Sequence, residues 1–295
     1  MSGCFRFNIM IRSAIFLLAV LTAAPAFAQL ASANKAGVSM GHVHYVVKDV
    51  EANKRFWVTL GGTSFTGGDG TQTMVKFPDV VVVLTQGESS GGTEGSVVNH
   101  VAFRVQSFAT VEAAGLKVAR LANFPGVGST FTPEGERIEL FENSATNLTF
   151  TQDAGYQDAI ADRHNHPLPI PIAFHHIHLY LPAGKVAEAK AWYAKMFGGV
   201  PGKRSNYDAV DLPGVNFNFS EAPKPTVPLK GRMLVHIGLE VENLEQFCRR
   251  LESLGVTFDV PYKKDGRFDG AILTDPWGTQ ISLTEGLRVL ALPRR

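Results

Sequence analysis

The chain has 295 residues, of which 28 are Lys or Arg and 27 are Asp or Glu, so its formal net charge at pH 7 is +1. A near-neutral chain offers no basic surface for the phosphate backbone of a nucleic acid, and we expect no nucleic-acid partner. The length is enough for two ordinary domains.

The first 28 residues have the pattern of a secretory signal peptide. Arg6 and Arg12 precede an apolar run over residues 14–20, and a small-residue stretch ends with Ala-Phe-Ala at 26–28. The apolar run is shorter than the roughly 20 residues that cross a bilayer, which argues against the alternative of an anchoring helix. Cleavage near Ala28 leaves 26 basic and 27 acidic residues, a net charge of −1. We therefore expect a periplasmic or secreted protein with no stable membrane insertion after cleavage.

Four short predicted strands with a histidine near the start recur along the chain. They cover 41–47 (GHVHYVV), 99–105 (NHVAFRV), 175–181 (HHIHLYL) and 235–241 (VHIGLEV). The spacing between them is roughly 58, 76 and 60 residues, which indicates an internal repeat of four modules with a longer gap in the middle. Consecutive modules are therefore expected to form two pairs.

The segments after these strands predict the rest of each module. In the first and third modules a helix with an aromatic pair ends on two glycines, at 61–62 and 198–199, and Asp49 is the expected N-cap of the first helix. The second and fourth modules end on a Pro- and Gly-containing turn followed by an alternating strand, at 132–141 and 274–283.

Two connecting segments divide this pattern. Residues 87–96, rich in Gly and Ser, predict a flexible connector between the first two modules. Residues 153–171 contain three prolines near their end and predict an extended linker. The expected domains are therefore residues 38–152 and 172–288, with two modules in each.

Cys248 has no cysteine partner once the leader carrying Cys4 is removed, so no disulfide within the mature chain is expected. Apolar residues recur around Cys248 at helical spacing, which predicts a packed thiol on the buried face of an amphipathic helix rather than a nucleophile.

Strand alternation decides which side chains share a face. His42 and His44 fall on one face of their strand, as do His176 and His178. In the strand at 137–141, Glu139 faces away from the apolar Ile138 and Leu140. Histidine side chains at matched positions of four repeated strands are typical of a metal site more than of scattered structural residues.

These motifs resemble the vicinal oxygen chelate superfamily, which includes glyoxalase I, extradiol dioxygenases, fosfomycin-resistance enzymes and bleomycin-binding proteins. The resemblance covers roughly residues 41–287. It is carried by the His-Val-x-x-x-Val-x-Asp opening at 42–49, the Pro-x-Gly-x-x-Ile-Glu-Leu ending at 133–140 and the Asp-Pro-Trp-Gly turn at 275–278. It implies an α+β fold of four βαβββ modules, paired into two cup-shaped mixed sheets.

The resemblance also implies a ligand set, because metal ligands in this superfamily come from the first strands of two paired modules and the last strand of the second. For the N-terminal pair these positions are His42, His100 and Glu139, with His44 as a candidate acid-base group on the same strand face. The C-terminal pair has His176 and His236 but Ser282 in place of the carboxylate. Glu285 falls on the opposite face, so the second site is expected to bind metal weakly or not at all.

Two imidazoles and one carboxylate suit Fe(II), Mn(II), Zn(II) or Ni(II) and leave coordination positions open. The expected function is a metal-dependent dioxygenase or a glyoxalase-type lyase or isomerase, acting on a small substrate that chelates through two adjacent oxygens. The alternative is a non-catalytic protein that sequesters an aromatic or antibiotic-like ligand. The residues leave open the metal, the substrate and whether the chain forms a homo-oligomer.

Overall fold

A computed structural model describes residues 30–67, 72–146, 148–156, 165–264 and 269–290. The signal peptide predicted over residues 1–28 and its cleavage site near Ala28 lie outside these residues. No helix in the described ranges is long and apolar enough to cross a membrane.

The described chain consists mainly of strands, with a few short helices. The strands are β1 Val38–Val47, β2 Thr63–Thr66, β3 Thr73–Phe77, β4 Val80–Gln86, β5 Val98–Val105, β6 Ala119–Arg120, β7 Val127–Phe131, β8 Arg137–Glu142, β9 Phe150–Gln152, β10 Ile172–Leu181, β11 Val200–Arg204, β12 Tyr207–Leu212, β13 Val215–Glu221, β14 Leu234–Val241, β15 Phe258–Lys263, β16 Asp269–Thr274 and β17 Gln280–Glu285. The helices are α1 Val50–Thr59, α2 Phe108–Ala113, α4 Val186–Phe197, α5 Leu244–Ser253 and α6 Leu287–Leu290.

The local predictions for the helices are confirmed. Asp49 caps α1 by accepting a hydrogen bond from the backbone N–H of Ala52. Gly198 ends α4 in the left-handed conformation, at φ 68°. Cys248 is buried on α5, which confirms the packed thiol, and burial raises the pKa of that thiol to about 11, which disfavours the reactive thiolate.

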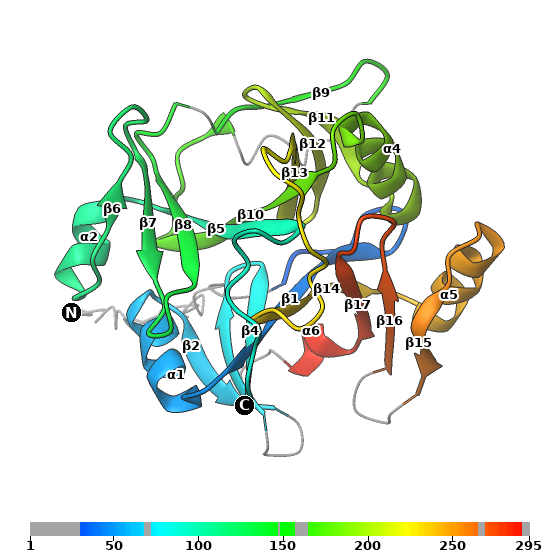
Figure 1. The fold of residues 1–295 in the computed structure, drawn as a ribbon, viewed down its shortest axis with the longest axis horizontal. Helices are drawn as coiled ribbons and strands as arrows, with labels where there is room; N and C mark the ends of the chain where they lie inside the picture. The colour runs from blue at the N-terminus through cyan, green and yellow to red at the C-terminus, as the bar shows by residue number, and fades with distance from the viewer. Residues whose placement is uncertain (1–29, 68–71, 147, 157–164, 265–268, 291–295) are drawn as a thin grey trace, which may run out of the picture.

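Two mixed sheets contain all four modules, as predicted, but the modules pair differently. One sheet has the order β15-β16-β17-β14-β1-β4-β3-β2 and therefore joins the first module to the fourth. The other has the order β6-β7-β8-β5-β10-β13-β12-β11-β9 and joins the second module to the third. We call them the outer-module sheet and the inner-module sheet. Figure 1 shows the blue β1 beside β14, and the green β5 beside β10.

This pairing corrects the prediction that consecutive modules pair. Each sheet takes strands from both sides of the proline-containing linker, and one hydrophobic cluster contains residues from all four modules. Trp57 of α1 packs against Phe103 of β5, for example, with ring centroids 5.9 Å apart. The division into domains 38–152 and 172–288 stays a prediction. Among the described residues, both sheets and the main core take residues from each of these two halves.

The connector at 87–96 also differs from its prediction. Ser90 N–H donates to the Gly231 carbonyl and Met233 N–H donates to the Gly91 carbonyl, so the segment is tied to the chain before β14. Thr93 is buried and its backbone N–H donates to Glu136. The segment therefore makes specific contacts along its length, and a side chain at Gly92 would meet Glu136.

The two sheets turn their apolar faces toward the shared core and their histidine-bearing faces away from it. In β10, Ile177 and Leu179 belong to the core, while His176 and His178 alternate with them on the opposite face. In β8, Ile138 and Leu140 belong to the core, and Glu139 projects to the opposite face as predicted. This alternation places the candidate ligands inside the two cups.

Candidate metal centre

The inner-module cup brings together two histidines and one glutamate from three strands. His100 comes from β5, His176 from the adjacent antiparallel β10, and Glu139 from β8, which runs parallel to β5. The His100 Nε2 atom lies 3.0 Å from Glu139 Oε2 and 3.2 Å from His176 Nε2. The His176 Nε2 atom lies 3.4 Å from Glu139 Oε2. All three side chains are buried.

This spacing fits a shared cation. Ligand atoms about 2.1 Å from a metal, at neighbouring corners of an octahedron or tetrahedron, are roughly 3.0–3.5 Å apart. The three measured separations fall in that interval, and the donor set is the two-histidine, one-carboxylate triad of first-row divalent metals. The residues present therefore fit a divalent metal ion.

The electrostatics put these groups in the protonation states that metal binding requires. Burial lowers the pKa of His176 well below its usual value, helped by Arg204 and His175, and burial also lowers the pKa of His100. Burial acts to raise the pKa of Glu139, but His100 together with Arg137 and Arg204 lowers it below its ordinary value. Near neutral pH the histidines are neutral and Glu139 is ionised.

Each candidate histidine ligand is oriented by the side chain that precedes it in the chain. His100 Nδ1 lies 2.8 Å from Asn99 Oδ1, and His176 Nδ1 lies 2.8 Å from His175 Nδ1. The contact between His175 and His176 is allowed because the register of β10 against β5 shifts between Phe174 and His176. Hydrogen bonds of this kind fix the ring orientation and tautomer of a metal-binding histidine.

His178 is a further donor close to the triad. Its ligand atom and those of His100 and His176 lie within 4.8 Å of one another, so a three-histidine set is a second way to hold an ion. We favour Glu139 as the third ligand, since its oxygen is closer and anionic, whereas His178 Nε2 lies 2.8 Å from Ser220 Oγ. His178 therefore has the place of a neighbouring acid-base group.

A cavity of about 730 Å³ opens beside the triad. Its lining includes Asn99, Ser129, Phe131, Arg137 and Tyr180. The volume is ample for a small organic molecule, and the lining combines aromatic surface with a few polar groups, as ligand sites commonly do.

The structure corrects the predicted ligand set at His42. This residue lies in the outer-module cup, where its Nε2 atom is 3.1 Å from His236 Nε2. His44, the predicted acid-base group, lies in the same cup, with Nε2 2.9 Å from Thr85 Oγ1. His100 and Glu139 come together as predicted, but their partner is His176. The predicted set of His176, His236 and Ser282 is likewise divided between the two cups.

The two cups match position by position, which explains why the sequence pattern pointed to His42 where the structure places His176. His42 contacts His236 diagonally across β1 and β14, as His176 contacts His100 across β10 and β5. The directly opposite residues are His44 with His236 and His178 with His100. Ser282 pairs with Gly238 where Glu139 pairs with Ala102. The outer-module cup therefore has Ser282 at the position where the inner-module cup has its carboxylate, the feature from which the weaker site was predicted. Glu285 cannot supply that carboxylate, because its oxygens accept from the backbone N–H groups of Asn243 and Leu244 at the start of α5.

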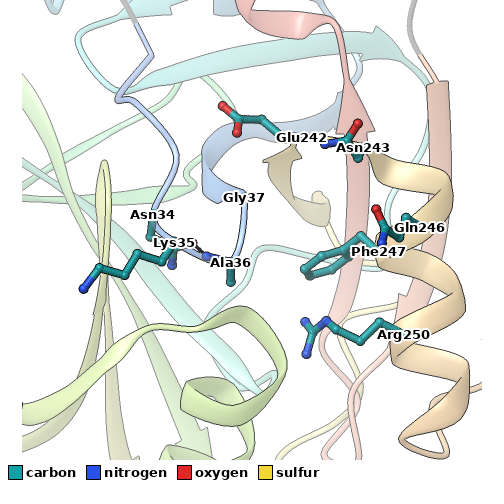
Figure 2. Close-up of a pocket in the computed structure, with 9 residues that line it drawn as sticks. All are labelled: Asn34, Lys35, Ala36, Gly37, Glu242, Asn243, Gln246, Phe247 and Arg250. Atoms are coloured by element: carbon teal, nitrogen blue, oxygen red, sulfur yellow. Dashed lines mark hydrogen bonds between the residues drawn. The ribbon is translucent and has the colours of Figure 1, made fainter.

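A second pocket, shown in Figure 2, lies between residues 34–37 and α5 and has a volume of about 400 Å³. Its polar groups complete the end of α4. The Asn34 side chain donates to the carbonyls of Phe197 and Gly198, and Arg250 donates to the carbonyl of Met196. Donors at these positions satisfy carbonyls that a helix leaves without partners, so we assign this pocket no chemistry.

Comparison with known proteins agrees with the fold. Residues 173–283 match the family model described as the glyoxalase/bleomycin resistance protein/dioxygenase superfamily. No curated protein matches the chain in sequence. Glyoxalase I from Zea mays has a similar structure, with a TM-score of 0.60 and 14% identity over 86% of this chain and 94% of that one. A putative dioxygenase from Bacillus subtilis has a TM-score of 0.58 and 12% identity over 91% of this chain and 92% of that one.

At such identities the structural likeness concerns the fold alone, and it extends over most of the chain. The family model covers the third module and most of the fourth, from Ala173 in β10 to Leu283 in β17. Residues 173–283 thus match the glyoxalase/bleomycin resistance protein/dioxygenase superfamily in sequence, and the described chain shares the fold of glyoxalase I over both halves.

Proposed function

We propose that this protein is a divalent-metal-dependent enzyme whose metal is held by His100, His176 and Glu139. The observation that supports the proposal is the convergence of three buried donor atoms within 3.4 Å of one another, from three different strands. Burying an ionised carboxylate is costly unless opposite charge compensates it. A divalent cation would add to the positive charge that Arg137 and Arg204 already place near Glu139.

The reaction class follows from the donor set and the cavity beside it. A triad that covers one side of an ion leaves positions for a substrate that binds through two adjacent oxygens. When bound, the metal would stabilise negative charge on those oxygens or lower the pKa of a coordinated water. The chain itself would orient the substrate in the 730 Å³ cavity and keep bulk water from the buried triad. His178, with Ser220 behind it, is placed to accept or donate a proton.

Dioxygenase chemistry and glyoxalase-type proton transfer both remain within this proposal, with Fe(II), Mn(II), Zn(II) or Ni(II) as the metal. We also propose export to the periplasm or beyond, on the pattern of the first 28 residues. Non-catalytic sequestration of a ligand is the outcome that the experiment below separates from catalysis.

The sharpest test compares two histidines that hold matching positions in the two cups. Metal binding is measured by isothermal titration calorimetry, and bound metal by mass spectrometry, for wild type, His176→Ala and His42→Ala. We expect His176→Ala to lower affinity by more than the 10- to 100-fold that is about the usual effect of a residue supporting a ligand. His42→Ala is the control and should retain wild-type affinity.

Equal metal binding by wild type and His176→Ala, with both folded, would remove the basis of the proposal. Loss of metal binding in His42→Ala alone would instead support His42 as the ligand, as the sequence predicted. If metal binds as expected, anaerobically prepared protein is assayed with catechols and with hemithioacetals. Turnover of one class identifies the reaction, and tight binding without turnover identifies a sequestering protein.

A further inference from the structure

Arg137 lies between the candidate metal centre and the cavity beside it. It precedes Glu139 by two residues in β8, so both side chains project from the same face of the strand. Arg137 lines the cavity, and its Nη1 atom is 3.5 Å from Glu139 Oε1. The guanidinium therefore lies where a molecule bound at the triad would extend into the cavity.

The other contacts of Arg137 are made with the pair that orients the first ligand. Its Nη2 atom lies 2.6 Å from Asn99 Oδ1 and 2.6 Å from His100 Nδ1. Its Nε atom is buried and has no hydrogen-bond partner within the part of the chain that the structure describes. An arginine offers five N–H donors in a fixed planar arrangement, and here that donor set is only partly used.

The contacts of His100 Nδ1 with Arg137 and with Asn99 require opposite tautomers of the imidazole. Arg137 always donates, so its hydrogen bond to Nδ1 places the ring proton on Nε2, toward Glu139, whereas a hydrogen bond to Asn99 Oδ1 places the proton on Nδ1. Metal coordination through Nε2 requires the second tautomer, with the proton on Nδ1. In that state His100 donates to Asn99, and Arg137 loses one acceptor while retaining Asn99 Oδ1.

Occupation of the triad would thus leave Arg137, which lines the cavity, with an Nη2 hydrogen that has lost its acceptor, besides the unpartnered Nε. A carboxylate on the substrate is the group that satisfies N–H donors and the charge of a guanidinium together. The surroundings of Glu139 also suit an anion, because Arg137 and Arg204 act with His100 to lower the pKa of Glu139.

We propose that the substrate is an anion that carries a carboxylate besides its two adjacent oxygens, and that Arg137 binds this carboxylate. The inference rests on the proposed metal centre. Arg120 lines the same cavity but already makes two hydrogen bonds to the carboxylate of Glu112, so it is not the residue that selects the substrate.

The test uses Zn²⁺-loaded full-length protein, because zinc has no redox chemistry, and two probes that differ by one carboxylate, catechol and 3,4-dihydroxybenzoate. Zinc binding is measured first for wild type, Arg137→Gln and Arg120→Gln, so that failure of the metal centre is recorded separately. Dissociation constants of both probes are then measured by calorimetry on each loaded protein.

We expect wild type to bind 3,4-dihydroxybenzoate about 10- to 100-fold more tightly than catechol, as a charged hydrogen bond to a carboxylate implies. Arg137→Gln should lose most of this preference, and Arg120→Gln, which removes the same charge, should keep it. Zinc-loaded wild type that binds the two probes equally, or binds neither, overturns the inference and leaves the metal centre standing. If both variants lose the preference equally, the preference arises from the overall positive charge of the cavity and not from a contact with Arg137, which also overturns the inference.

Discussion

The missing carboxylate of the outer-module cup can be restored by Ser282→Glu, and the structure predicts that a second metal site results. The two imidazole Nε2 atoms of this cup are 3.1 Å apart, against 3.2 Å in the inner-module cup. Ser282 has the same register against Gly238 of β14 as Glu139 has against Ala102 of β5. A glutamate at position 282 would therefore approach both histidines from the third strand.

The Ser282→Glu change is expected to lower the free energy of unfolding without metal, and metal binding is expected to raise it again. Ser282 is only 7% exposed, and adding side-chain atoms at a packed position costs about 1–3 kcal/mol. Gln280 stands where the inner-module cup has Arg137, so the new carboxylate has no neighbouring guanidinium on its own strand. The metal-free variant should thus be less stable than wild type. Metal at 100 times its dissociation constant would restore about 2.7 kcal/mol.

The assay is metal stoichiometry by mass spectrometry, together with urea unfolding in the presence and absence of Zn²⁺. We expect the stoichiometry to rise from one to two in Ser282→Glu, and from none to one when His176→Ala is also present. Ser282→Gln, similar in size but neutral, is the matched control and should stay at one. A folded Ser282→Glu protein that still binds one ion at saturating zinc would show that the two cups do not correspond as described.

Three further predictions concern residues around the two cups. Gly238→Ala would place a Cβ atom 2.1 Å from His42 Nδ1, so the free energy of unfolding in urea should fall by about 1–3 kcal/mol, and the loss should disappear when His42→Ala is added. Asn99→Leu removes the acceptor for His100 Nδ1 and should weaken metal binding about 10- to 100-fold by calorimetry, whereas unchanged affinity would deny Asn99 its orienting role. Burial lowers the pKa of His42 to about 3 and that of His44 to about 4, so below about pH 6.5 the unfolded chain binds protons that the folded chain does not. The free energy of unfolding should therefore fall as the pH drops from 6.5 toward 4, by up to about 1.4 kcal/mol per pH unit for each histidine. Urea unfolding of His44→Gln should show a shallower dependence on pH.

Local features of the fold could be predicted because neighbouring residues determine them. The cap at Asp49, the left-handed Gly198 and the orientation of Glu139 each follow from a residue's own geometry and that of its close neighbours. The same holds for Glu285, whose predicted face directs it to the N–H groups at the start of α5 and away from the cup.

The pairing of modules could not be predicted by the same means. The first strands of all four modules carry histidine at the same place, so any pairing of two of them brings two imidazoles together. His100 and Glu139 belong to one module and lie together in the structure as predicted, whereas their third partner depends on which module lies beside them. His42 and His176 satisfy the local pattern equally well, and only the long-range contact between β5 and β10 distinguishes them.

A signal that favours the observed pairing was nevertheless present in the third module. Arg204 at the end of β11 is almost fully buried and stacks over the rings of Phe141 and Tyr207. It helps to lower the pKa of Glu139, so the cation of the third module compensates the anion of the second. In the corresponding hairpin of the first module, β2–β3, Thr66 pairs with Thr73 where Arg204 pairs with Tyr207. Pairing the second module with the first would separate Arg204 from Glu139, and an ionised carboxylate is costly to bury without opposite charge nearby. Charge complementarity between the second and third modules therefore favours the pairing that completes the candidate metal centre.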